Sequence, residues 1–246
     1  MSRLEHRNPT VKAALLLVVS LCTLLLLDVG VLGVLYLLGL AGALTAARVG
    51  VRALAAAQVP FVLFGVGLVM VNALTRPGEP FIEGAAVRVT HEGLVVGLAL
   101  ALRGMVIGVL TVAFLATTPP RALMVSLVQH ARLSPRYAYA LLAGHRMLAA
   151  MPRRWATVRA AQAVRAPLGR DGRPRLGVRD FGLAAFTLLV GSVRASERVA
   201  LAMESRGLAA GPRTVWRPVP LGTGDAALAV AVLGVLAAAV ALGRAG

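Results

Sequence analysis

The chain has 246 residues, of which 58% are hydrophobic and 15% charged, and its mean hydropathy is +0.80. This composition excludes an ordinary soluble domain and indicates a membrane protein. The formal net charge of +16 comes almost entirely from arginine, because Lys12 is the only lysine. Such a charge suits nucleic acid, anionic lipid, an acidic partner or membrane topology, but an aromatic content of 4% argues against a surface that stacks nucleic acid bases. The single cysteine, Cys22, excludes a disulfide within the chain and a thiolate metal site.

Five apolar runs predict transmembrane helices. The first two would measure about 50 Å as one helix, which exceeds a hydrocarbon core of about 30 Å, so residues 28–30 (Asp-Val-Gly) are predicted to form a tight turn. The first run has the basic start of a signal peptide, but no small-residue cleavage site directly follows it and a second run does, so we expect it to be retained. The predicted spans are residues 13–27, 29–47, 59–74, 94–116 and 226–242.

The distribution of arginine predicts the orientation. Seventeen arginines lie between residues 117 and 224, three basic residues precede the first span and two arginines follow the second. The loop at 75–93 has two arginines, Arg76 and Arg88, offset by three glutamates. Positive residues stay on the cytoplasmic side, so we expect the N-terminus and residues 117–224 in the cytoplasm and the C-terminal tail outside.

The basic region is predicted to be helical. It starts with a short amphipathic helix over 119–133 and continues with two long helices over 134–166 and 178–207, separated by a Gly/Pro/Arg linker. Pro152 should kink the first long helix, and Gly207 is well placed to end the second.

The predicted fold is therefore an all-α membrane protein with about five transmembrane helices and a cytoplasmic region of two long helices plus a short amphipathic one. Its expected parts are an N-terminal membrane domain with four spans (1–116), the cytoplasmic region (117–224) and a C-terminal transmembrane helix (225–246). The expected location is the plasma membrane of a bacterial-type cell.

The two long helices end alike. Arg165 and Arg206 each follow a small residue four positions earlier, Ala161 or Ala202, and each precedes a small residue. An exposed arginine near a helix C-terminus gains about 0.3–1 kcal/mol from the helix dipole, which is one explanation. The other is that both helices insert arginine tips into two equivalent acidic pockets of a partner dimer, since arginine stays charged and binds carboxylates bidentately.

Four stretches resemble one family, the transmembrane T component of energy-coupling factor transporters. "RNPTVKAALLL" resembles the family's start of the first span, and "HEGLVVGLALALRGMVIGVLTVAFLATTPP" resembles a later span with its Thr-Thr-x-Pro end. "HRMLAAMPRRWATVRAAQAVRA" resembles a helix ending in Ala-Gln-x-x-Arg, and "ALAMESRGL" resembles the Ala-Met-x-x-Arg-Gly motif, the most specific of the four.

The resemblance implies a scaffold that works with other subunits. In that family two cytoplasmic coupling helices dock terminal arginines into two ABC-type ATPases, and the membrane face holds a substrate-binding S component. The resemblance thus implies a non-catalytic coupling subunit for uptake of a vitamin, a vitamin precursor or a transition-metal ion, with ATP and Mg²⁺ bound by the partners and no cofactor in this chain. The docking residues that it implies are Arg165, Arg206, Gly207, Ala161, Gln162, Ala202 and Met203.

Two departures from the family pattern stand out. The first motif reads Val-Arg-Ala where Ala-Arg-Gly is usual, so the end at Arg165 is expected to differ from that at Arg206. Arg153 and Arg154 follow Pro152 where an acidic residue nearby would be expected.

Arg103 falls near the middle of the fourth span. A charge there costs about 2.5–3.5 kcal/mol on insertion scales and is functional by default. It is either an internal hydrogen-bonding anchor that fixes span packing or the S-component face, or a snorkelling or purely structural arginine. Close by, Gly104 and Gly108 have the spacing of a helix-contact seam, although the chain is rich in glycine and alanine throughout.

Other classes of function have little support in the sequence. No nucleophile with its base and no phosphate-binding Gly-x-x-x-x-Gly-Lys-Ser/Thr motif occurs, and the acidic loop residues Glu79, Glu83 and Glu92 with His91 match no transition-metal spacing. A stand-alone membrane transporter or a membrane protein acting on anionic lipid are the alternatives. The first would need intramembrane binding residues and the second an acid–base pair.

Overall fold

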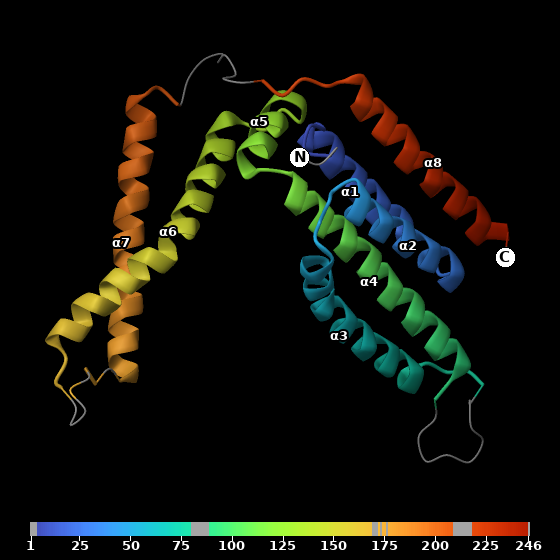
Figure 1. The fold of residues 1–246 in the computed structure, drawn as a ribbon, viewed down its shortest axis with the longest axis horizontal. Helices are drawn as coiled ribbons and strands as arrows, with labels where there is room; N and C mark the ends of the chain where they lie inside the picture. Colours follow the sequence, from blue (N-terminus) through green and yellow to red (C-terminus); the bar gives the residue numbers. More distant parts are fainter. Residues whose placement is uncertain are drawn as a thin grey trace. The chain divides into compact units, whose positions relative to one another are not determined.

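The computed structural model describes residues 4–79, 89–168, 172, 174–175, 177–208 and 218–245. Over these residues the protein is all-helical, as predicted, with only an isolated β-bridge between Leu168 and Pro174. Glu83, Arg88, most of the predicted linker, Arg213 and Arg217 lie outside the described residues. The helices are α1 (Pro9–Thr23), α2 (Val29–Thr45), α3 (Val51–Thr75), α4 (His91–Thr117), α5 (Pro120–His130), α6 (Pro135–Arg165), α7 (Val178–Ser205) and α8 (Thr223–Ala245) (Figure 1).

The chain divides into two compact units. Unit 1 comprises Met1–Ser126 and Pro218–Gly246 and contains α1 to α4 and α8; unit 2 comprises Leu127–Arg217 and contains α6 and α7. The division runs through α5. The division reflects contacts within the chain and not the position of a membrane, so the predicted domain boundaries at residues 116 and 225 stay predictions.

Side-chain caps explain where the helices of unit 1 begin. Asn8, Asp28 and Thr90 precede α1, α2 and α4, and each side chain accepts a hydrogen bond from a backbone N–H in the first turn. Pro9 follows Asn8 at the first helical position, where its missing N–H costs nothing. Thr118 after α4 is extended because Pro119 disfavours a helical conformation in the residue before it.

The turn between the first two helices lies earlier than predicted. α1 ends at Thr23, the turn starts at Leu24, and Asp28 caps α2, so Val29 and Gly30 belong to the first turn of α2. The prediction of a turn at residues 28–30 was therefore wrong in its position, because the Asp28 side chain ends the turn by accepting from Val31 N at 2.9 Å.

The third helix is longer than predicted. The predicted span began at residue 59, whereas α3 begins at Val51 and continues through Pro60. The additional residues, "VRALAAAQ" (51–58), are rich in alanine, the strongest helix former, so the helix starts before the apolar run. Neighbouring helices and local adjustments commonly satisfy the backbone group that a proline frees in a membrane helix.

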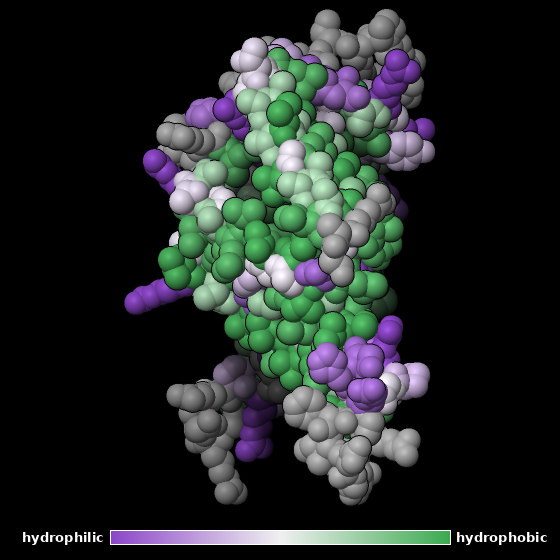
Figure 2. Space-filling view, turned by 90° about the vertical axis from the view of Figure 1, so that its right-hand side faces the viewer, coloured by the Kyte–Doolittle hydropathy of each residue, from purple (hydrophilic) through white to green (hydrophobic). Residues whose placement is uncertain are grey.

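Among the described residues, three helices are long and apolar enough to cross a membrane: α3, α4 and residues Thr223–Gly243 of α8. α1 and α2 are apolar but have only 15 and 17 residues, so the count of five spans stays a prediction. Figure 2 shows mainly hydrophobic side chains over the face turned toward the viewer, with hydrophilic residues mostly near its upper and lower ends. The protein is thus a membrane protein.

Glycine allows α3 and α4 to pack closely and antiparallel. A Cβ on Gly97 would lie 2.7 Å from Val69 Cα, and one on Gly65 would lie 3.0 Å from Ala101 Cβ. Of the two glycines predicted to form a seam, Gly108 faces the Phe61 ring at 3.0 Å, whereas Gly104 has nothing within 4 Å of its Cβ position. The seam therefore includes Gly108 but not Gly104, because Gly108 lies on the same face of α4 as Gly97, where the two helices touch.

Unit 2 is held together by a crossing of α6 and α7. The rings of Trp155 and Phe181 meet edge to face with centroids 5.1 Å apart, and the Arg159 guanidinium lies 6.0 Å from the Trp155 centroid. α6 is assigned as one helix through Pro152, and its ribbon changes direction in its middle part (Figure 1).

Large side chains spaced at helical intervals along the two long helices are in large part uncovered. On α7, Phe186, Leu189 and Leu201 are 60–65% exposed and form an apolar stripe. On α6, Leu141, His145 and Leu148 are exposed, whereas Trp155, Val158 and Gln162 in the second half of the helix are half-buried. Trp155 contacts α7 through Phe181.

Candidate functional site

The end of α7 has the geometry predicted for it. Arg206 is the C-cap, and Gly207 adopts a positive φ of 71°. Gly207 N donates to Glu204 O at 2.8 Å and Leu208 N donates to Met203 O at 3.0 Å, which is the Schellman pattern. The helix-ending role of Gly207 is confirmed.

The end of α6 is different, as the Val-Arg-Ala sequence led us to expect. Arg165 is the last helical residue and Ala166 is extended, with φ −77° and ψ 145°. Ala166 N donates to Ala163 O at 3.3 Å. Arg165 therefore belongs to the last turn of its helix, whereas Arg206 follows the last residue of its own.

Exposure is nevertheless matched at the two ends. Arg165 and Arg206 are both exposed, and so are the small residues four positions before them, Ala161 and Ala202. The next residues, Gln162 and Met203, are half-buried. Gln162 also has a buried Oε1 without a hydrogen-bond partner among the described residues. The end of each helix thus presents an exposed arginine one turn after an exposed alanine, which leaves space for a partner.

The C-terminal ends of α6 and α7 lie at opposite ends of unit 2 (Figure 1). Arg165 is the last residue of α6 and Arg206 follows the last residue of α7, so the two arginines lie far apart. Arg165 is ten residues beyond Trp155 and Arg206 is 25 residues beyond Phe181, which is about 15 Å and about 37 Å along the helices from their crossing. One binding pocket cannot hold both side chains, so a molecule that binds both arginines needs a separate pocket for each.

Arg103 of α4 has partners that the sequence could not name. Its Nη2 donates to Leu26 O at 2.9 Å and to Leu24 O at 3.3 Å, in the turn that follows α1. These carbonyls lie beyond the helix and would lack partners in hydrocarbon. Arg103 Nε is buried without a partner among the described residues. The anchor interpretation of Arg103 fits these contacts.

The contact with Arg103 also sets how far the first two helices extend. Arg103 is 12 residues, or about 18 Å, from the start of α4 at His91. The turn between α1 and α2 therefore lies at the level of the middle of α4, which explains why both helices are short.

A polar cluster of the buried residues Asn8, Ser126 and Asp225 and the half-buried Thr10 joins three distant segments of unit 1. Ser126 Oγ donates to Asn8 Oδ1 at 2.6 Å and lies 2.7 Å from Thr10 Oγ1. Asn8 N donates to Asp225 Oδ1 at 2.8 Å, and Asn8 Nδ2 donates to Val219 O at 3.2 Å. The cluster holds α1, α5 and the start of α8 together at one end of the unit.

Lys12 lies one turn further along α1 and is 8% exposed. Its Nζ donates to Thr117 O at 2.9 Å and to Leu4 O at 3.1 Å. Lys12 therefore ties α1 to the end of α4, next to the cluster.

The sequence analysis missed the roles of Asn8, Ser126 and Asp225. Asn8 and Lys12 were quoted within a family motif, Lys12 also as the only lysine, and residue 225 was given only as the start of the predicted C-terminal helix. A usable signal was present for Asp225, since a carboxylate in the first turn of an apolar helix needs a partner if it is buried. Ser126 carried no such signal.

The acidic loop residues make local contacts. Glu79 N donates to Glu92 Oε2 at 3.0 Å, and His91 N donates to Glu79 O at 3.1 Å. No group of three metal-ligating side chains occurs among the described residues.

The family model of the CbiQ cobalt transport protein matches residues 1–214, which is most of the chain. The chain belongs to this family. No curated protein matches the sequence. As a CbiQ-family protein with apolar membrane helices, it is a membrane component of a transport system that works with other subunits, and members of the family are generally not catalytic themselves.

Proposed function

We propose that this CbiQ-family protein is the coupling subunit of an energy-coupling factor importer. α6 and α7 would be the coupling helices, Arg165 and Arg206 their docking residues, and the membrane helices the seat of a substrate-binding S component. The observation that carries the proposal is the pair of exposed arginines at opposite ends of unit 2, each beside an exposed alanine. Two separate arginine tips suit two ATPase subunits, one tip for each.

The uncovered stripe of α7 supports a protein partner for unit 2. Phe186, Leu189 and Leu201 would be in contact with water if the helix stood alone in the cytoplasm. Exposed apolar surfaces of this kind mark interaction sites. A partner that covers the stripe would also hold α6 and α7 in their crossing.

The proposed mechanism is mechanical. Closure of the ATPases would displace the tips of α6 and α7 and alter the angle at which the helices cross at Trp155 and Phe181. The membrane face would then release or reshape the seat of the S component. ATP and Mg²⁺ would bind to the ATPases, and this chain would hold no cofactor of its own.

The cargo would be a vitamin, a vitamin precursor or a transition-metal ion, and the description of the family as a cobalt transport protein favours cobalt. Specificity would reside in the S component. The basic excess of residues 117–224 supports a cytoplasmic position for this region and for the N-terminus, in a cell with a plasma membrane.

The test is to change Arg165 and Arg206 to alanine, singly and together, in the full chain co-expressed with its ATPase and S-component partners. Each single change should weaken copurification of the ATPases by about tenfold or more, because truncation of a buried charged pair at an interface costs about 2–5 kcal/mol. The double variant should lose uptake altogether.

Arg153→Ala and Arg198→Ala are matched controls, because both arginines are exposed on α6 and α7 but away from the ends. They should keep assembly and uptake. Unchanged assembly and transport in the double variant would refute the docking role of the two arginines.

A further inference from the structure

α5 (Pro120–His130) is the helix through which the chain passes from unit 1 to unit 2. Its residues all lie in the described part of the chain, and of these Ser126 alone is buried. Ser126 Oγ donates to Asn8 Oδ1 at 2.6 Å and lies 2.7 Å from Thr10 Oγ1. Unit 2 starts at the next residue, Leu127. The hydrogen bonds of Ser126 therefore hold α5 to α1 at the position where the chain leaves unit 1.

The connection from α5 to α6 is short and is hydrogen-bonded to both helices. It consists of residues 131–134. Leu133 N donates to Leu127 O of α5 at 3.2 Å, as in a Schellman helix end. Ala138 N of α6 donates to Ser134 O at 3.2 Å. A displacement of the start of α6 would therefore pass to α5, because these bonds hold the backbone between the two helices.

The polar cluster continues from Ser126 to α8. Asn8, which accepts from Ser126, donates through its backbone N to Asp225 Oδ1 at 2.8 Å. Asp225 Oδ2 accepts from Gly222 N at 2.9 Å. Hydrogen bonds to a buried carboxylate are strong, because the charge and the low dielectric constant of the surroundings both strengthen them. The starts of α1 and α8 are therefore held to each other and to α5.

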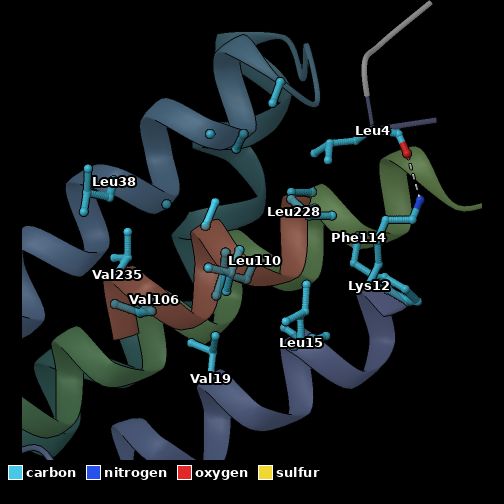
Figure 3. Close-up of a pocket in the computed structure, with 18 of the residues that line it drawn as sticks. Leu4, Lys12, Leu15, Val19, Leu38, Val106, Leu110, Phe114, Leu228 and Val235 are labelled. Carbon is cyan, nitrogen blue, oxygen red and sulfur yellow. Dashed lines mark hydrogen bonds between the residues drawn. The ribbon is translucent and has the colours of Figure 1, made fainter. Parts of the chain in front are cut away.

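Beyond the cluster, α1 and α8 are packed less closely. Leu15 and Val19 of α1 line a cavity of about 390 Å³ together with Leu228 and Val235 of α8 (Figure 3). A space of this kind removes packing contacts from the side chains that line it. The hydrogen bonds at the starts of the two helices are therefore the fixed point between α1 and α8 at this end of the unit.

We propose that Ser126 and Asn8 are positioning residues that transmit movement of the coupling helices to α1 and α8. The inference rests on the coupling role proposed above and supplies a route from α6 to the membrane helices. When α6 moves, α5 moves with it, and the hydrogen bonds of Ser126 displace the starts of α1 and α8 together. The cluster stays intact throughout the cycle, because opening it would leave the buried Ser126 hydroxyl without its acceptor.

The experiment replaces the hydrogen bond by a disulfide in a chain that carries Thr10→Cys, Ser126→Cys and Cys22→Ser. The two oxygens are 2.7 Å apart, so sulfurs at these positions can reach the bond length of about 2.05 Å. The full chain is assembled with its ATPase and S-component partners in vesicles, and uptake of Co²⁺ is measured per ATP hydrolysed. The oxidised form should match the unaltered protein, and reduction should lower the ratio about fivefold or more. Cys22→Ser alone, treated in the same way, controls for effects of the oxidant and the reductant.

Ser126→Ala tests the same route without redox treatment. The ATPases should still copurify and hydrolyse ATP, because Arg165 and Arg206 are unchanged, but uptake per ATP should fall about fivefold or more. Thr23→Val is the matched control. Thr23 is also fully buried, but its hydroxyl donates to Ser20 O at 3.0 Å within α1. It should leave the ratio unchanged.

The oxidised and reduced forms are the same assembled protein, so the disulfide test does not depend on the folding of Ser126→Ala. Equal uptake per ATP in the two forms would overturn the proposal. So would a disulfide that stops uptake, since the cluster would then have to open during the cycle. Failure of the coupling role itself would be seen separately, as unchanged assembly when both Arg165 and Arg206 are replaced.

Discussion

The two units of the molecule bury their side chains in different ways. Unit 1 has backbone-close packing between α3 and α4 at Gly97 and a buried polar cluster around Asn8. In unit 2, Ala138 of α6 and Ala184 of α7 are the buried residues of their helices, and the ring pair of Trp155 and Phe181 marks the crossing. Unit 1 thus makes most of its contacts within the chain, whereas unit 2 leaves its apolar stripe for another molecule.

The two units differ in this way because their side chains suit different surroundings. Lipid covers the exposed leucines and valines of unit 1, so its helices need only close contacts with each other. α7 is amphipathic, and at the cytoplasmic location that we propose for it only protein would cover its apolar stripe. Stability of the isolated chain should therefore depend on unit 1, and assembly should depend on unit 2.

Gly97→Leu should have the largest effect on stability. A Cβ at Gly97 would lie 2.7 Å from the backbone of Val69, so α3 and α4 must move apart. We expect the free energy of unfolding, measured by SDS titration in mixed micelles, to fall by about 2–3 kcal/mol.

Gly104→Leu provides the comparison on the same helix, because Gly104 has nothing within 4 Å of its Cβ position. It should change stability by less than about 0.5 kcal/mol. A similar loss in both variants would mean that the packing of α3 and α4 does not depend on Gly97.

Asn8→Ala should follow, with a loss of about 2 kcal/mol, because it removes an N-cap and leaves the buried Ser126 hydroxyl without its acceptor. The same SDS titration measures it. Thr157→Ala in unit 2 also removes a side-chain hydrogen bond, to Arg153 O at 3.1 Å, but at an exposed site. The free energy of unfolding of Thr157→Ala should not change measurably. If Thr157→Ala and Asn8→Ala lost the same stability, the contrast between the two units would be wrong.

Arg103→Leu should lower global stability less than Asn8→Ala, by under about 1 kcal/mol, because the loss of two hydrogen bonds is offset by the lower cost of leucine in the membrane. Its effect should be local. Cys22, the only cysteine, lies just before the turn that Arg103 holds, so N-ethylmaleimide should modify it several-fold faster.

Arg103→Lys should give an intermediate rate of Cys22 modification, since an ammonium can keep one of the carbonyl bonds. If Arg103→Leu left the rate unchanged, the turn after α1 would be held without Arg103 and the anchor interpretation would be wrong.

The sequence predicted the helices of both units well. The starts of α4, α6 and α7 lie within three residues of the predicted ones, because their caps, prolines and apolar periodicity are local signals. Two positions were wrong. The turn near Asp28 lies earlier, because Asp28 caps α2, and α3 starts eight residues before the predicted span, because its alanine-rich first turns are helical without being strongly apolar.

The sequence by itself determined the membrane class, the helical composition, the arginine-ended helices and the likeness to a transport family, because composition, periodicity and short motifs are carried by neighbouring residues. Only the tertiary structure decided which glycines touch a neighbouring helix, which carbonyls Arg103 holds, that Asn8, Ser126 and Asp225 meet, and that Arg165 and Arg206 lie at opposite ends. These features depend on contacts between segments up to 217 residues apart, and a single sequence has no local signal for such contacts.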